Sequence, residues 1–418
     1  MHPLAIIGGG ASALAASLAA RARGVRAVAI APPGADGCGV AYSTRDPLHR
    51  LNVCAARMSI VEHDLTDFVS WLRARDGQVQ PQGYYPRAVY GEYLREHWRS
   101  VDALSAVAQR LAPRAGGWRI ETSDGAIDAA RVVLAIGVPP AQRLPGLAAD
   151  PRVSLDAYAP RDGWPQRGLL IGSSLTAVDV ALTWCTARAD AELTVISRHG
   201  LWPFAHNDEA RSGEIGVDVR SPRHILRSLR RAIDGGVDAT AAVDALREAT
   251  VDLWTSFAHA HRARFLRHAR SHWDRARHRM APQVAREIAA LQTQGRVRLI
   301  AGRVQRVDAG TDLAVHWRPR GRREIETLRV DAVVQCTGFD GGLAAADSPL
   351  LRSLLDGGLA VPDAHRLGIA LDREHRVIDA RSNAHTTLRA LGALGRGSLW
   401  ECTAIPEIRR SATRIVAP

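Results

Sequence analysis

The sequence predicts an α/β protein with two Rossmann-type domains, because a short apolar strand runs into a glycine-containing turn and then a helix at two places. These two units lie at 4–19 and 168–188. Another kind of apolar strand, which ends in a small-residue turn, also occurs twice, at 131–137 and 330–338. Residues 207–295 break the alternation of strands and helices and are expected to be helical throughout. The predicted fold is therefore two dinucleotide-binding domains with a helical insert.

The order of these units divides the 418-residue chain into three segments. Residues 1–145 are expected to form the first part of one dinucleotide-binding domain, and residues 331–418 its second part. Residues 146–330 are expected to form the other domain, with the helical insert at about 207–295. A chain of this length can bury a large core and commonly holds two or three domains.

The first turn, at 8–13, has the spacing Gly-x-Gly-x-x-Ala between a strand and a helix. Gly8 permits the tight turn, Gly10 lets a pyrophosphate approach the backbone, and Ala13 lets helix and strand pack closely. Unpaired N–H groups at the start of the helix, where Ser12 lies, are expected to face the phosphates.

Three short motifs that follow are expected to face a ligand. A glycine-rich loop at 37–44 should pass close to it, with Gly39 and Tyr42 as candidate contacts. Asn52 is a candidate polar group in the pocket. Arg87 follows a proline that predicts a helix start, where its guanidinium could reach an anionic oxygen. Two tyrosines in that helix, at 90 and 93, are expected to pack in the core.

The second unit predicts a second nucleotide site. Gly172, Ser173, Ser174 and Thr176 form its turn and first helical residues. Arg198 follows the next strand, where an NADP-specific site places a guanidinium against the 2′-phosphate.

The two small-residue turns and the C-terminal segment are expected to return to the first domain's ligand. Gly137 and Gly338 lie where the chain must pass close to a cofactor. Residues 391–409 predict a strand, a glycine loop and a helix, as in flavoproteins with two dinucleotide sites, where such a helix points its N-terminus at the flavin ring. Trp400 and Thr403 are the candidate contacts there.

The helical insert is rich in arginine and histidine, most densely at 265–282. We expect one helix that packs its apolar residues inward and offers Arg267 and His278 to a pocket. An anionic substrate would suit such a cluster. His268 and His272 have the spacing of metal ligands, but no carboxylate or cysteine completes a site, and we expect no metal.

Composition excludes several classes of protein. The net charge of +12 comes from 55 arginines and no lysine, scattered along the chain, which argues against a nucleic-acid-binding face. The absence of lysine excludes a lysine Schiff base. The five cysteines contain no Cys-x-x-Cys pair, which argues against a disulfide-reductase mechanism and suits a reducing cytoplasm. No apolar run is long enough to span a membrane.

Taken together, the motifs resemble the NAD(P)/FAD-binding protein family related to the lysine and ornithine N-monooxygenases. They cover nearly the whole chain in order. The matching pieces are 8–13, 37–42, 51–53, 57–59 with Met58, 86–91, Leu175, Thr176 and Asp179, 197–200, Trp202, Pro203 and His206, 265–282, 336–338, and Trp400 with Glu401.

The resemblance implies FAD in the first domain and NADPH in the second. It implies a monooxygenase that passes oxygen from a hydroperoxyflavin to the nitrogen of an amino acid or amine, in particular an anionic one, with O₂ as co-substrate. The candidate catalytic residues are Asn52, Arg87, His206, Arg267 and His278. Neither a nucleic-acid nor a membrane partner is implied, and both a monomer and an oligomer are compatible with these motifs.

Three positions depart from the usual pattern. Ala31 replaces the acidic residue that normally holds the adenosine ribose, Ser174 replaces a glycine in the second turn, and Ile136 replaces a threonine in the first small-residue turn. They keep two alternatives open. One is a flavin reductase or dehydrogenase that does not use O₂ productively. The other is a regulatory protein that keeps the fold but has lost its cofactors.

Overall fold

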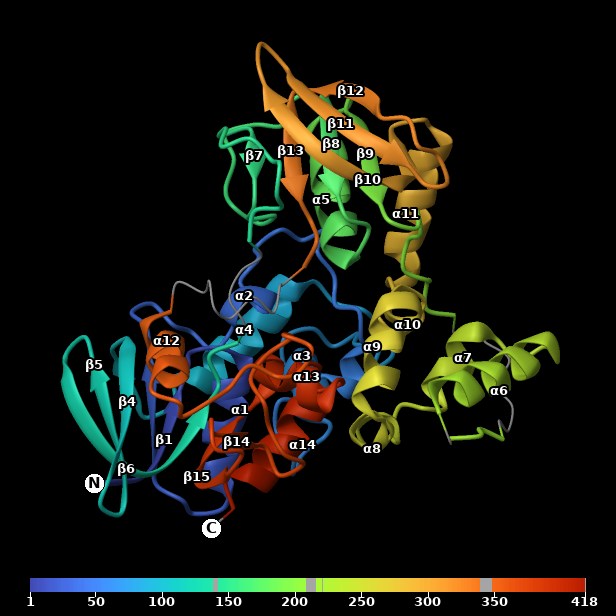
Figure 1. Ribbon diagram of the computed structural model, residues 1–418. Helices are drawn as coiled ribbons and strands as arrows, with labels where there is room; N and C mark the ends of the chain where they lie inside the picture. Colours follow the sequence, from blue (N-terminus) through green and yellow to red (C-terminus); the bar gives the residue numbers. More distant parts are fainter. Residues whose placement is uncertain (138–141, 208–215, 220, 339–347, 418) are drawn as a thin grey trace.

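The structure is a computed structural model that describes residues 1–137, 142–207, 216–219, 221–338 and 348–417. It contains two α/β units, drawn one above the other in Figure 1, and a group of helices to one side of them. The first unit holds the N-terminal and C-terminal parts of the chain. The second unit and the helices come from the middle of the sequence.

The first unit is built on a mixed sheet of order β14-β15-β6-β1-β2-β3, with a β4–β5 hairpin attached to β6. Its core strands β1, β2, β6 and β15 are parallel. The strands are β1 (His2–Ile7), β2 (Ala27–Ala31), β3 (Ala103–Ser105), β4 (Ala108–Arg114), β5 (Gly117–Thr122), β6 (Gly125–Leu134), β14 (Arg376–Ile378) and β15 (Ala384–Ala390). Its helices are α1 (Ala11–Ala22), α2 (Gly39–Tyr42), α3 (Asp67–Arg73), α4 (Arg87–Trp98), α12 (Pro349–Asp356), α13 (Arg396–Leu399) and α14 (Ile405–Ile415), with 3-10 turns at Ala55–Arg57 and Gly392–Gly395.

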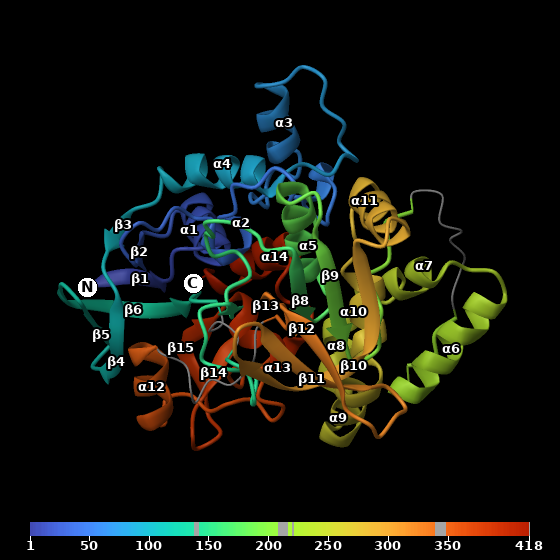
Figure 2. The same ribbon diagram turned by 90° about the horizontal axis from the view of Figure 1, so that it is seen from above.

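The second unit is a seven-stranded sheet of order β12-β11-β10-β9-β8-β13-β7. The strands are β7 (Val153–Ser154), β8 (Arg167–Ile171), β9 (Glu192–Ser197), β10 (Val297–Ala309), β11 (Leu313–Pro319), β12 (Glu326–Val330) and β13 (Ala332–Gln335). Helices α5 (Leu175–Ala187) and α11 (Pro282–Thr293) pack against it. The insert contains α6 (Pro222–Asp234), α7 (Ala239–Asp244), α8 (Thr250–Ser256), α9 (His259–His268) and α10 (Arg270–Arg277). Figures 1 and 2 both place α6 at the outer edge of the insert.

The repeated apolar strands occupy equivalent places in the two units. β6 lies beside β1, and β13 lies beside β8, so each strand neighbours the glycine-turn strand of its own sheet. The chain therefore returns to the first unit only after Gln335, and the boundary predicted at 330/331 falls a few residues too early.

The prediction of a single helix at 265–282 is wrong, because the helical structure of this segment is interrupted twice. Helix α9 ends at His268 and α10 ends at Arg277, and Met280 precedes α11. Met280 is buried, whereas Phe265 and Trp273 are only partly buried. The predicted loop at 37–44 likewise contains the short helix α2.

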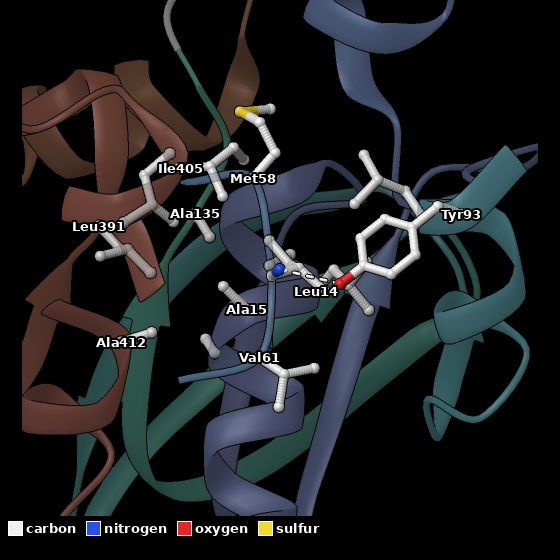
Figure 3. Packing of buried hydrophobic residues seen from close by; sticks show 14 of the residues in the cluster. Leu14, Ala15, Met58, Val61, Tyr93, Ala135, Leu391, Ile405 and Ala412 are labelled. Atoms are coloured by element: carbon white, nitrogen blue, oxygen red, sulfur yellow. Dashed lines mark hydrogen bonds between the residues drawn. The ribbon is translucent and has the colours of Figure 1, made fainter. Parts of the chain in front are cut away.

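The core of the first unit joins segments that are far apart in sequence. Figure 3 shows Leu14 of α1 packed among Met58, Ala135 and Ile405 of α14. The buried Tyr93 also contributes, and its hydroxyl accepts a hydrogen bond from the backbone N–H of Ile60 at 3.0 Å. Tyr90 is equally buried, so the predicted core role of both tyrosines is confirmed. Among the residues that the structure describes, no helix combines the length and apolarity needed to cross a membrane.

Acid should destabilise the first unit through His375. Burial lowers the pKa of this imidazole to about 4, below its ordinary value near 6.5, although its Nδ1 lies 3.2 Å from the carbonyl oxygen of Ala390. Protonation therefore favours the unfolded chain. The contribution of His375 is complete above about pH 6.5 and is lost as the pH falls toward 4, by up to about 3 kcal/mol. In thermal melts at several pH values, the melting temperature of His375→Asn should fall less steeply toward acid pH than that of the wild type. Asparagine tolerates the positive φ of 63° at this position.

Candidate active site

The first glycine turn has the geometry of a phosphate-binding loop. Gly8 has a φ of 141°, and a Cβ there would lie 2.3 Å from the carbonyl oxygen of Ala135. Gly10 lies against Gly39, because a Cβ added to Gly39 would lie 3.2 Å from the Gly10 Cα. No side chain caps the start of α1, so its first N–H groups are available to an anion. These features fit the pyrophosphate of a dinucleotide such as FAD.

The ribose end of this site lacks its usual acid. Ala31 ends β2 and is buried. Asp36, the next acidic residue, does not replace it, because one of its carboxylate oxygens accepts from the Cys38 N–H at 3.0 Å and the other pairs with Arg95 at 2.8 Å. The features of the first site that fit a nucleotide are therefore the turn and the start of α1, and the end of β2 offers no carboxylate to a ribose.

The second glycine turn repeats the first and accommodates its unusual serine. Gly172 has a φ of 110°, and a Cβ there would lie 2.4 Å from the Cys336 carbonyl oxygen. The Ser174 hydroxyl donates to that same carbonyl at 3.3 Å, so the side chain turns back toward β13. Ser173 is also engaged, since its hydroxyl donates to the Leu201 carbonyl at 2.7 Å. Helix α5 again starts without a side-chain cap, which leaves the N–H groups near Thr176 for a phosphate.

Arg198 lies directly after β9 and is exposed. In the described part of the chain it forms no hydrogen bond or ion pair, so its guanidinium is available to a ligand. Gly137 and Gly338 follow β6 and β13 with similar φ angles of 72° and 75°, and no atom of the described residues lies within 4 Å of a Cβ added at either. The two strand ends thus share one open conformation.

Substitution of Arg198 should discriminate between the two nicotinamide cofactors. Arg198→Ala removes charge-assisted hydrogen bonds worth about 1.5–3 kcal/mol. We expect the KM for NADPH to rise by roughly 10- to 100-fold and the KM for NADH to stay within about twofold, measured by cofactor oxidation. Arg303→Ala, at an exposed arginine of the same sheet, is the matched control. Equal effects on both cofactors would contradict a 2′-phosphate contact.

Arg87 joins the two units instead of lying free to meet a ligand. Its Nη2 pairs with the Asp179 carboxylate of α5, and its Nη1 donates to the Tyr158 hydroxyl at 3.3 Å. The Tyr158 hydroxyl in turn donates to Asp179 at 2.8 Å. The two charged side chains are 14% and 10% exposed. The expected contact between Arg87 and a phosphate or flavin oxygen is therefore corrected to an inter-domain ion pair.

A second cross-connection between the units lies beside the first. The buried His49 ring contacts the Thr183 hydroxyl of α5 at 2.9 Å through Nε2 and the Thr44 hydroxyl at 2.7 Å through Nδ1. Thr183 also donates to Asp46. Burial lowers the pKa of His49, so the ring is neutral at pH 7. His49 was not predicted, because a lone histidine outside any motif has no distinctive pattern.

The structure brings together Asn52 of the first unit and His206, which lies just before the insert. His206 Nε2 lies 2.9 Å from the Asn52 carbonyl oxygen, to which it donates in that tautomer. The Tyr84 ring packs against the imidazole with 4.8 Å between ring centroids. Asn52 is half-buried, and the contact is made by its backbone carbonyl.

Buried charges hold the insert against the C-terminal segment. Arg277 of α10 lies 3.3 Å from Glu401 and 3.7 Å from Glu407. Arg247 pairs with Glu407 at 2.9 Å, and the indole N–H of Trp273 donates to Glu401 at 2.9 Å. Apart from Glu401, these partners went unpredicted, because each pair is separated by more than a hundred residues in sequence.

His278 follows α10 at this junction and is partly buried. Burial lowers the pKa of its imidazole, and the carboxylates of Glu401 and Asp274 oppose that shift only in part. The ring is therefore neutral at pH 7 and can accept a proton. The pocket role expected for His278 stays a prediction.

Four other expected contacts fall in different surroundings. Met58 is 2% exposed and belongs to the core, so its predicted cofactor contact is corrected to a packing role (Figure 3). Arg267 is exposed on α9, which corrects its predicted place in the pocket. Trp400 is buried and stacks on Trp254 at 4.8 Å between ring centroids. Thr403 is exposed just before α14.

Comparison with known proteins supports this reading of the fold. Residues 5–139 match the model of the FAD-NAD(P)-binding family, whereas no curated protein matches the sequence. Among solved structures, the ornithine N-hydroxylase of Kutzneria sp. 744, solved with reduced FAD, NADP⁺ and L-ornithine, has a TM-score of 0.70 at 16% identity, over 100% of this chain and 98% of that one.

Two further structures show how widely the fold is shared. The L-lysine 6-monooxygenase of Pseudomonas syringae has a TM-score of 0.67 at 18% identity, with 100% and 98% of the two chains covered. A bacillithiol disulfide reductase of Staphylococcus aureus has a TM-score of 0.62 at 14% identity, with 99% and 97% covered. Residues 5–139 are thus an FAD-NAD(P)-binding region, and the whole chain has the two-domain fold of flavin-dependent oxidoreductases.

Proposed function

We propose that this protein is an FAD- and NADPH-dependent monooxygenase that hydroxylates the nitrogen of an amino acid or amine. The observation that carries the proposal is the pair of glycine turns, each followed by a helix start without a side-chain cap, in a chain with the fold of the two N-hydroxylases named above. For the proton transfer we propose His278, which is neutral at pH 7 and half-buried. FAD, when bound, supplies the redox chemistry by accepting a hydride from NADPH and transferring oxygen from O₂. The residues of the chain must hold the cofactors, prepare the amine and exclude water.

His278 is suited to preparing the amine. An amine attacks an electrophilic oxygen through its nitrogen lone pair, which the ammonium form lacks. The neutral imidazole takes one proton from the ammonium group, so that imidazolium and a free amine result. Glu401 and Asp274 then stabilise the positive charge that the ring has gained, since both carboxylates act on its titration.

The cysteines argue against the dithiol-reductase alternative. All five are free and buried, and burial raises the pKa of Cys38, Cys336 and Cys402 to about 12. Thiols of this kind form little thiolate at neutral pH, and thiolate is the nucleophile of disulfide exchange. Five unpaired thiols also support our placement of the protein in a reducing cytoplasm.

The visible spectrum of the purified protein under air tests this function. We expect flavin bands that bleach when NADPH is added and then return. A screen of amino acids and amines should find one that accelerates NADPH oxidation and yields an N–O product without stoichiometric hydrogen peroxide. Peroxide with every amine would favour the flavin reductase, and a protein that no added FAD turns yellow would favour the regulatory alternative.

His278→Gln isolates the proton-transfer step. We expect kcat/KM for the amine to fall by about 100-fold at pH 7, the lower range for a general base, and to recover as the pH approaches the pKa of the free amine. Reduction of the flavin by NADPH should be unchanged, because His278 has no part in it. If kcat/KM for the amine fell by the same factor at every pH, His278 would have a structural role instead.

A further inference from the structure

The helix that begins at the second glycine turn also carries contacts that hold the two units together. Helix α5 starts directly after that turn, at Leu175, and its Thr183 hydroxyl reaches the segment 44–49 of the first unit. This segment follows the loop whose Gly39 lies against Gly10 of the first glycine turn. Figures 1 and 2 both show α5 next to the region of α2 and α4. A short path of chain therefore connects the two nucleotide turns through this contact.

The hydrogen bonds of this contact form a closed cycle. The Asp46 backbone N–H donates to the Thr44 hydroxyl oxygen at 3.3 Å. The Thr44 hydroxyl lies 2.7 Å from His49 Nδ1, and His49 Nε2 lies 2.9 Å from the Thr183 hydroxyl. The Thr183 hydroxyl then donates to the Asp46 carboxylate, so the cycle ends on the residue where it begins.

The single proton of the Thr183 hydroxyl determines the tautomer of the imidazole. Because this hydroxyl donates to Asp46, it can only accept from His49, and Nε2 must carry the hydrogen. The neutral imidazole then has its lone pair on Nδ1, where it accepts from the Thr44 hydroxyl. All the hydrogen bonds of the cycle thus run in one direction, and aligned hydrogen bonds strengthen each other.

A second proton on the imidazole breaks this arrangement. Nδ1 would then donate toward Thr44, whose hydroxyl hydrogen would lose its acceptor. The charged imidazole would also lie near the Arg87 guanidinium of α4, whose backbone N–H donates to the His49 carbonyl at 2.7 Å. The carboxylates of Asp179 on α5 and of Asp46, 3.6 Å from Nε2, favour the charged form. Burial outweighs both carboxylates and lowers the pKa of His49.

Tyr158 is the remaining titratable group against the imidazole. Its ring packs edge-on to His49 with 5.4 Å between ring centroids. Burial raises the pKa of the phenol, so Tyr158 stays neutral and contributes no charge that would hold an imidazolium in place. Protonation of His49 therefore weakens the contact between α5 and the first unit.

We propose that His49 is a positioning residue for reduction of the flavin, because its neutral imidazole holds α5 in place against the first unit. The inference rests on the proposed function, in which NADPH on the second unit gives a hydride to FAD on the first. Reacting atoms must lie about 3–3.5 Å apart, and a displacement of about 1 Å can slow a reaction roughly 100-fold. Since α5 is one continuous helix, movement at Thr183 also moves the second glycine turn. Acid should therefore slow flavin reduction through His49.

Nitrogen NMR of the flavin-loaded protein, labelled with ¹⁵N-histidine and free of NADPH, tests the cycle without any turnover. The His49 signal is the one that His49→Gln removes. It should show only the Nε2–H tautomer at about pH 7.5. Thr183→Val removes the acceptor on α5 and should yield a mixture of tautomers, whereas Thr183→Ser should keep the single one. A wild-type Nδ1–H tautomer, or a tautomer that Thr183→Val leaves unchanged, would overturn the proposal.

Stopped-flow absorbance at saturating NADPH measures the positioning. We expect the rate constant of flavin reduction in the wild type to fall about threefold or more between about pH 7.5 and 5.5, with the same midpoint as the His49 titration by NMR. His49→Gln can still donate to Thr183 but gains no proton, so its rate constant should change less than about twofold over that range. His2→Gln, at an exposed histidine at the start of β1, should keep the wild-type profile.

The outcomes separate this proposal from the proposed function. A wild-type rate constant that does not change with pH, or an equal fall in His49→Gln, would overturn the role of His49 even if amines are hydroxylated. Flavin reduction that depends on His49 in a protein that hydroxylates no amine would keep this proposal and overturn the monooxygenase.

Discussion

Gly10→Val should yield a folded protein that has lost its flavin. The φ of Gly10 is −109°, an ordinary value, and an added Cβ meets only Gly39, whose Cα would lie 3.3 Å away. Folding should therefore lose about 1 kcal/mol at this helix start. The added methyl groups fill the space that the pyrophosphate must enter. Loss of two charge-assisted hydrogen bonds from the start of α1, at about 1.5–3 kcal/mol each, lowers FAD affinity by more than about 100-fold.

The ratio of flavin absorbance to protein absorbance after purification measures this effect, and titration with added FAD gives the affinity. Gly77→Val is the matched control, because no atom lies within 4 Å of a Cβ at Gly77 and its φ is not positive. That variant should keep its flavin. If Gly10→Val bound FAD like the wild type, the first glycine turn would not be the FAD site.

Arg87→Met should destabilise the whole molecule. The change leaves the Asp179 carboxylate buried, with only the Tyr158 hydroxyl as a neighbouring donor. Removal of one partner from a buried ion pair costs about 3–5 kcal/mol, which corresponds to a fall of the first thermal unfolding midpoint on the order of 10 °C. The pair also fixes the second unit against α4. We therefore expect slower reduction of the flavin by NADPH as a second effect.

The double variant Arg87→Met with Asp179→Leu should be more stable than Arg87→Met alone, because no charge is then left without a partner. Arg75→Gln is the control, since Arg75 and Glu96 form a pair that is 40% and 39% exposed and should contribute no more than about 1 kcal/mol. A stability of Arg87→Met equal to that of Arg75→Gln would show that the inter-domain pair is not buried in solution.

The glycine turns were predictable because their geometry is local. A positive φ at Gly8 and Gly172, and the close approach of each to the strand beside it, follow from a strand, a turn and a helix within about ten residues. The repeat of the apolar strands was also evident in the sequence. The sequence did not show to which sheet each copy belongs, because the pairing of β13 with β8 joins residues about 160 apart in the chain.

The chemistry expected of the insert stays a prediction, whereas its pairings come from the structure. Residue types in the insert predicted arginine and histidine near an anion, and the structure places His206 Nε2 2.9 Å from the Asn52 carbonyl oxygen. The helix at 265–282 was wrong because the hydrophobic period continues through Ala269 although the helix does not.

The sequence by itself determined the two nucleotide-binding turns, the strands that carry them and the order in which they occur, because these features depend on contacts between near neighbours in the chain. Tertiary structure alone decided which charges are satisfied. Arg87 pairs with Asp179, 92 residues away, and Arg277 pairs with Glu401. Pairing of buried charges is a property of distance and burial in the folded chain, and no spacing in the sequence encodes it.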